Sequence, residues 1–196
     1  MTHEAYPDTH HDVYSKTVFG FWIYLLSDFM LFATLFAAYA VLHKSTFGGP
    51  SGEELFNLPR TLIQTLILLT SAFTVGLGGA MAHRKNKWGT FSFFLVTFIL
   101  GIAFIWMMGT EFTYLSAQGH NWKSNAFLSM FYTLIGIHGL HLIIAILWIP
   151  ILMIPMFREG ITLISIKRFT CLRMFWQFLN IIWIFIFNLV YLLGVI

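Results

Sequence analysis

Five long apolar segments, separated by short polar gaps, fill almost all of this 196-residue chain. They cover about residues 18–42, 61–82, 88–112, 126–154 and 172–195. Each reaches the ~20 residues that an α-helix needs to cross a hydrocarbon core about 30 Å thick. Because hydrocarbon offers backbone amides no hydrogen-bond partner, such segments are predicted to be helices. The sequence therefore predicts an all-α integral membrane protein, a bundle of five transmembrane helices.

The composition leaves little room for anything else. The chain is 58% hydrophobic and only 10% charged, which excludes an ordinary soluble domain. We expect a polar cytoplasmic tail at residues 1–17 and one transmembrane domain at residues 18–196. The net charge of +3 does not indicate a nucleic-acid partner, because the basic residues lie at the ends of the predicted helices.

The distribution of Lys and Arg predicts how the chain crosses the membrane. A cytoplasmic N-terminus places eight basic residues on the inner side and three on the outer side. The inner residues are Lys16, Arg84, Lys85, Lys87, Arg158, Lys167, Arg168 and Arg173, and the outer residues are Lys44, Arg60 and Lys123. Since cytoplasmic loops carry the excess of basic residues, the N-terminus is predicted to be cytoplasmic and the C-terminus periplasmic.

Two acidic residues are candidates for function inside the membrane. Asp28 lies ten residues into the first span, roughly 15 Å along the helix axis. A central Asp costs about 2.5–3.5 kcal/mol on insertion scales, so its side chain must face protein, a partner subunit or water. A proton-pathway role and a structural role are equally open. Glu111 follows the uncharged run of the third span and lies either within the membrane or at its outer interface.

The histidines argue against a haem or metal site in this chain. His138 and His141 are three residues apart, hence on one helix face, and cannot bind one haem iron from opposite sides. A structural or lipid-headgroup role is favoured over metal binding. The N-terminal tail holds His3, Glu4, Asp8, His10, His11 and Asp12, for which a solvated flexible tail is favoured over a weak metal site.

Other polar and special residues in the spans are assigned to packing. Gln177 and Asn180 are three residues apart in the fifth span and could hydrogen-bond to a neighbouring helix. Pro150 and Pro155 are expected to kink or end the fourth span. The single cysteine, Cys171, is interpreted as a small packing residue. Aromatic residues predicted at the membrane interfaces are Trp22, Trp88, Trp122, Trp148 and Tyr191.

Several stretches resemble subunit III of the haem–copper terminal oxidases, most closely the five-helix version in bacterial cytochrome bo-type ubiquinol oxidases. They are FGFWIYLLSD (19–28), the segment 104–112 that contains Glu111, GIHGLH (136–141) and FWQFLNIIW (175–183). Four such stretches in the same order on the corresponding helices make the resemblance specific. It covers nearly the whole chain after the polar tail.

The resemblance implies a non-catalytic subunit of an oxidoreductase complex in the bacterial inner membrane. The complex would oxidise ubiquinol, reduce oxygen to water and contribute to the proton gradient. Haem b, haem o and copper would lie in subunit I, with no redox centre or metal in this chain. The implied partners are oxidase subunits I, II and IV and phospholipid, while ubiquinol is a substrate of the complex that is not bound here. In the family, subunit III stabilises subunit I, supports proton uptake and encloses lipid between two helix bundles.

The same resemblance implies roles for particular residues. Asp28 and Glu111 fall on the family's acidic positions, as proton-related or structural groups. His138 and His141 fall on a motif near bound phospholipid and, with Trp176, are lipid-binding or structural candidates. At two positions of the last helix, relatives usually carry His and Asp, whereas this chain has amide side chains that do not titrate. These are Gln177 and Asn180, so a structural role is implied for them and a proton role is not.

Three alternatives remain. An independent transporter is one, although the spans show no inverted repeat. A haem-carrying cytochrome b-type subunit is another, opposed by the spacing of the histidines. The third is subunit III of a cytochrome c oxidase, against which the presence of five rather than seven spans favours a quinol oxidase by analogy.

Overall fold

The computed structural model describes residues 9–43, 57–120, 122–192 and 194, and for residues 9–15 it describes the backbone alone. Its helices are α1 (Thr9–Leu42), α3 (Leu58–His83), α4 (Lys87–Ala117), α5 (Ala126–Glu159), α6 (Leu163–Ile186) and the π-helix η1 (Phe187–Leu192). Within these residues there is no strand, and five helical segments are long and apolar enough to cross a membrane. The prediction of an all-α protein with five such helices is confirmed.

Short polar side chains mark where four of the helices begin. Asn86, Asn125 and Thr162 each accept a hydrogen bond from the backbone N–H three residues later, at 3.1, 2.7 and 3.2 Å. Asn57 does the same for α3 at 3.4 Å. Such caps satisfy N–H groups that have no partner inside the helix. At the other end of α5, Gly160 adopts a positive φ of 83° and turns the chain towards α6.

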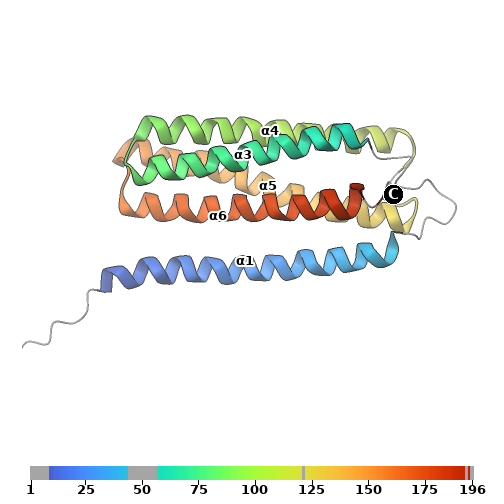
Figure 1. Ribbon diagram of the computed structural model, residues 1–196, viewed down its shortest axis with the longest axis horizontal. Helices are drawn as coiled ribbons and strands as arrows, with labels where there is room; N and C mark the ends of the chain where they lie inside the picture. The colour runs from blue at the N-terminus through green and yellow to red at the C-terminus, as the bar shows by residue number, and fades with distance from the viewer. Residues whose placement is uncertain (1–8, 44–56, 121, 193, 195–196) are drawn as a thin grey trace, which may run out of the picture.

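The helices form a four-helix bundle with a fifth helix on its side (Figure 1). Consecutive helices α3, α4, α5 and α6 pack against their neighbours, and α6 closes the bundle by packing against α3. Helix α1 packs against α5 and α6. It starts at one end of the bundle, while η1 finishes at the other end. The described residues thus form one bundle, without a second bundle that would enclose a lipid cleft with the first.

Large aromatic residues fill the centre of the bundle. Trp176, Trp183 and Phe104 are at most 1% exposed, and the Phe104 and Trp183 rings meet edge to face at 4.7 Å. The outer surface is also apolar: Met30 is 70% exposed and Phe73 67%. Exposed apolar faces of this extent on every helix match a lipid environment rather than water.

Two helices begin earlier than the sequence predicts. Helix α1 begins at Thr9, so part of the segment predicted as a polar tail is helical. Helix α6 begins at Leu163 rather than near residue 172. The prediction took Lys167 and Arg168 as loop residues, but Thr162 caps the helix and long basic side chains can extend from a helix end to the membrane interface.

Two helices also end later than predicted. Helix α4 continues past residue 112 to Ala117, and α5 continues past residue 154 to Glu159. Pro150 and Pro155 lie inside α5 and do not end it. Proline removes one backbone hydrogen bond, but in a membrane the surrounding helices and local adjustments compensate for the loss.

Candidate functional site

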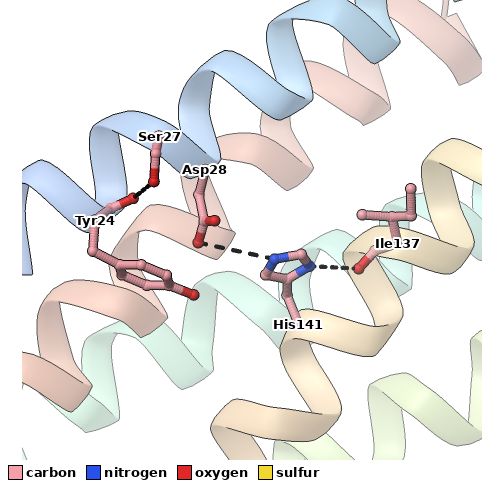
Figure 2. Close-up of polar contacts among 5 residues, drawn as sticks. All are labelled: Tyr24, Ser27, Asp28, Ile137 and His141. Carbon is pink, nitrogen blue, oxygen red and sulfur yellow. Dashed lines mark hydrogen bonds and ion pairs between the residues drawn. The ribbon is translucent and has the colours of Figure 1, made fainter.

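Asp28 and His141 form a polar pair between α1 and α5, deep in the apolar interior. Asp28 Oδ2 lies 3.9 Å from His141 Nε2, and the two side chains are only 12% and 14% exposed. Asp28 is twelve residues into the apolar segment Lys16–Leu42, close to its middle. The carboxyl therefore faces protein, as the insertion cost requires. Figure 2 shows the ring of Tyr24, one turn earlier on α1, with its hydroxyl directed towards the pair.

The hydrogen bond on the far side of the imidazole determines what the pair can do. His141 Nδ1 lies 2.8 Å from the carbonyl oxygen of Ile137 (Figure 2). A carbonyl only accepts, so Nδ1 carries a proton and a neutral ring presents an unprotonated Nε2 to Asp28. Asp28 Oδ2 is buried and has no hydrogen-bond partner among the described residues. The two groups are 3.9 Å apart, which is longer than a direct hydrogen bond, so the pair places an acid and a base side by side without a bond between them.

An apolar hollow adjoins this pair. It has a volume of about 290 Å³ and is lined by Phe21, Tyr24, Ile144, Trp148 and Phe175. Three helices, α1, α5 and α6, contribute to it, and its walls are almost wholly aromatic or aliphatic. Such a lining fits a hydrocarbon chain.

Glu111 is the centre of a second polar cluster, in which three helical elements meet. It lies on α4 and is 8% exposed. Gln64 of α3 donates to Oε2 at 3.2 Å, and the Tyr191 hydroxyl of η1 donates to Oε1 at 3.1 Å. Because α4 runs on to Ala117, Glu111 lies inside the helix and faces the bundle, not at the end of a span.

Arg60 lies next to this cluster. Its Nη2 donates to the Met107 carbonyl at 3.3 Å and to the Thr110 hydroxyl, which precedes Glu111 by one residue. Arg60, which is predicted on the outer side, lies in the first turn of α3 and bonds to α4. Arg60 thus joins the first turn of α3 to α4 beside Glu111.

Sequence reasoning missed Gln64 and the contact of Tyr191 with Glu111. Tyr191 was predicted near a membrane interface; it lies at the end of the last apolar segment, with its side chain fully buried against Glu111. The π-helical turn of η1 changes the direction of side chains at the end of α6, and a 3.6-residue periodicity does not predict such a turn. Gln64 could have been recognised from the sequence, because it is an amide within an apolar span.

His138 and Trp176 are both wholly buried inside the bundle. His138 Nε2 lies 3.2 Å from the Leu179 carbonyl of α6, and Trp176 Nε1 donates to the Ser71 hydroxyl of α3 at 2.9 Å. Their neighbours are protein on all sides, which favours the structural alternative over contact with lipid. Both histidines lie against Phe32 of α1, at ring-centroid distances of 6.5 and 5.4 Å, but it is His141 that lies beside Asp28.

Gln177 and Asn180 behave differently from each other. Asn180 is buried and donates to the Trp176 carbonyl of its own helix at 2.9 Å, while its Oδ1 has no partner among the described residues. Gln177 is exposed on the outside of α6. No bond from either amide to a neighbouring helix is observed in the described part of the chain, so that expectation stays a prediction for the assembled protein.

Metal ligands do not gather in the described residues: no group of three or more His, Cys, Asp or Glu side chains could hold an ion there. Cys171 is a buried free cysteine, in keeping with packing. The side chains of the predicted tail cluster, from His3 to Asp12, lie outside those that the structure describes, as does Lys44.

The fold and its buried polar clusters define a polytopic α-helical membrane protein with two buried carboxylic acids on its long apolar helices. A family model described as cytochrome c oxidase subunit III matches residues 1–195. The chain therefore belongs to the subunit III family of the haem–copper oxidases.

Individual relatives match along almost their whole length. The chain is 48% identical over 187 residues to the cytochrome bo(3) ubiquinol oxidase subunit 3 of Pseudomonas aeruginosa, covering 95% of this chain and 90% of that protein. The corresponding subunit of Pseudomonas putida is 44% identical over 185 residues, covering 94% and 89%. The cytochrome c oxidase subunit 3 of Bacillus sp. (strain PS3) is 39% identical over 202 residues, covering 100% and 95%. Because that last protein is covered almost completely, chain length does not separate the two kinds of oxidase.

Proposed function

We propose that this chain is the non-catalytic subunit III of a cytochrome bo-type ubiquinol oxidase. The observation that carries the proposal is the similarity to bo(3) ubiquinol oxidase subunits along nearly the whole of both chains. In this function the chain assembles with subunits I, II and IV. Subunit I holds haem b, haem o and copper, and ubiquinol reacts outside this chain.

The first role that we propose is to stabilise subunit I and to bind phospholipid. The hollow beside Tyr24 fits an acyl chain, because it is open, apolar and shared by three helices. His141 lies one turn from Ile144 in the wall of this hollow. Lipid bound here would fill the space between α1 and the bundle and hold α1 in place.

The second role is to support proton uptake by the complex. Asp28 and His141 place an acid and a base 3.9 Å apart in a mostly buried position, and Glu111 is a second buried carboxyl with fixed donors. Groups of this kind inside a membrane are typical of proton relays. The pair lies near mid-depth, so it can exchange protons only through a neighbouring subunit or enclosed water.

The topology and location follow from the same reasoning. We propose that the N-terminus is cytoplasmic, the C-terminus periplasmic and the membrane the bacterial inner membrane. The start of α1 and the end of η1 lie at opposite ends of the bundle, in keeping with an odd number of spans (Figure 1). The basic loop that contains Arg84 and Lys85 then lies on the cytoplasmic side.

Purification from native membranes tests the assembly. An affinity tag on this chain should bring down haem-bearing subunits in fixed ratio, together with ubiquinol oxidase activity. Isolation of the tagged chain alone would contradict the proposal.

Substitution of Asp28 tests the role of the polar pair. Asp28→Leu leaves His141 Nε2 without a partner in hydrocarbon and should weaken association or turnover stability about fivefold, the equivalent of about 1 kcal/mol. Asp28→Asn keeps hydrogen bonding and should be milder. Ser27→Ala is the matched control, because the exposed Ser27 hydroxyl bonds only to the Tyr24 carbonyl of its own helix. Unchanged subunit content and oxygen consumption in the Asp28→Leu variant would show that Asp28 has no special role in assembly or turnover.

Subunit III of a cytochrome c oxidase is the second candidate, favoured by the similarity to the Bacillus protein. The electron donor of the purified complex separates the two. Ubiquinol oxidation without oxidation of reduced cytochrome c supports the first proposal, and the reverse supports the second.

A further inference from the structure

A polar residue lies on the outer face of α6, where lipid would otherwise be expected. Gln177 is exposed, and its side chain has no hydrogen-bond partner among the described residues. It begins a stripe at helical spacing that continues with Ile181, Ile184 and Asn188, all exposed. Intervals of four and three residues place Gln177, Ile181 and Ile184 on one face of α6, and Asn188, in η1, donates to the Ile184 carbonyl of that face. This stripe, called the α6 outer face below, has an amide at each end and apolar residues between them.

Contacts to neighbouring helices place Gln177 at mid-depth. The preceding residue, Trp176, donates to Ser71, which lies at the midpoint of α3. Phe175 contacts His141, the partner of Asp28 near the middle of α1. Headgroups and ester carbonyls lie far from this level, so lipid there offers hydrocarbon alone.

The α6 outer face lies between two other helices, α1 and α3. On one side of it, Phe178 and Phe185 contact α1 through Phe32 and Phe36. On its other side, Trp176 and Trp183 bond to α3. At 100° per residue, the stripe lies between these two sets, so α1 and α3 flank it.

We infer that the α6 outer face is the docking site for a transmembrane helix of another oxidase subunit. The docking helix carries a hydroxyl, amide or carboxyl side chain at the level of Gln177. This inference rests on the proposed function, because it requires a membrane complex. A buried or lipid-facing amide without a partner is strongly unfavourable, and acyl chains have no donor or acceptor. A protein helix supplies both the hydrogen bond at Gln177 and apolar packing at Ile181 and Ile184.

Asn188 is an amide on the same face whose side chain has a hydrogen-bond partner. Its Nδ2 donates to the Ile184 carbonyl one turn earlier at 2.7 Å, so the helix itself provides part of its bonding. Gln177 has no such bond in the described structure. The difference makes Gln177, and not Asn188, the residue that requires a partner.

Photo-crosslinking in the intact complex tests the inference. A benzophenone amino acid is introduced at Ile181 and, as the matched control, at Ile99 on the outer face of α4. The two isoleucines are similarly exposed, at 52% and 57%. After irradiation of native membranes, the tagged chain is purified and its adducts are identified by mass spectrometry. An adduct of Ile181 with another oxidase subunit is expected. Adducts with lipid alone, or with a second copy of this chain, would overturn the inference.

A substitution provides the second measurement. Gln177→Leu should weaken retention of the contacting subunit about 3- to 30-fold, the range for loss of one interhelical hydrogen bond. Thr70→Val is the control, since the exposed Thr70 hydroxyl bonds to the Leu66 carbonyl of its own helix. Retention unchanged by Gln177→Leu would also overturn the inference. If no oxidase subunit co-purifies even with the wild-type chain, the proposed function fails instead, and the two failures are distinct.

Discussion

Replacing Tyr191 with Phe is a direct test of the Glu111 cluster. The substitution removes the hydroxyl that donates to Glu111 Oε1 at 3.1 Å and keeps the ring. The ring is fully buried beside Phe131 and Trp183, at centroid distances of 6.0 and 6.2 Å, so no cavity forms. Glu111 retains the bond from Gln64. The loss is therefore confined to one donor.

The expected magnitude follows from the nature of the acceptor. Interhelical hydrogen bonds in membranes contribute about 0.6 kcal/mol on average and at most about 1.7. Hydrogen bonds to charged groups contribute about 1.5–3 kcal/mol in folded proteins. Because Glu111 is a carboxylic acid with two fixed donors, we expect Tyr191→Phe to lower the free energy of unfolding by about 1–2 kcal/mol.

A double-mutant cycle with Glu111→Met isolates the interaction between the two residues. Unfolding is followed by circular dichroism during titration of the purified protein with a denaturing detergent. The coupling energy of Tyr191→Phe with Glu111→Met should reach about 1 kcal/mol. Tyr39→Phe is the matched control, since this buried tyrosine on α1 lies 3.5 Å from the Val190 carbonyl. It should be additive with Glu111→Met within about 0.5 kcal/mol. Additivity of the Tyr191 pair would refute the bridging role of Glu111.

Two further predictions concern the packing around Trp176. A Cβ on Gly101 would lie 2.9 Å from the Trp176 ring, so Gly101→Ala should destabilise the bundle by about 1–3 kcal/mol in the same unfolding assay. Gly136→Ala meets nothing within 4 Å and should be neutral or stabilising by up to about 1 kcal/mol, and equal effects of the two would contradict this packing. Ser71→Ala removes the acceptor of the Trp176 N–H and should cost about 1–2 kcal/mol, whereas Trp176→Phe also leaves a cavity and should cost more. A smaller loss for Trp176→Phe than for Ser71→Ala would show that the ring contributes little to packing.

The positions of the functional candidates were predictable in part. Asp28 and Glu111 are recognisable because a carboxylic acid in a long apolar segment must turn away from lipid, whatever its partners are. Their partners were not recognisable. Gln64 and Tyr191 are 47 and 80 positions away from Glu111, and Tyr191 reaches it through a π-helical turn. His141 was singled out from its spacing, but its contact with Asp28 depends on how α1 packs against α5.

The positions of the helix ends, like the functional candidates, were predictable only in part. The prediction from apolar segments gave the right number of helices apolar enough to span a membrane in the described part of the chain, because apolar length is a local property. It ended α5 too early at the prolines and began α6 too late at the basic residues. Charge and proline are poor markers of helix ends in a membrane, where neighbouring helices and interfacial side chains satisfy the backbone.

Apolar length alone thus establishes that the chain enters a membrane as five helices, since hydrocarbon requires helical hydrogen bonding over such segments. The direction in which each side chain faces is established only by helix packing. A water-soluble helix reveals its buried face by contrast between apolar and polar sides, but in lipid both faces are apolar and the contrast is weak. For this reason the pairing of Asp28 with His141 and the outward position of Gln177 become visible only in three dimensions.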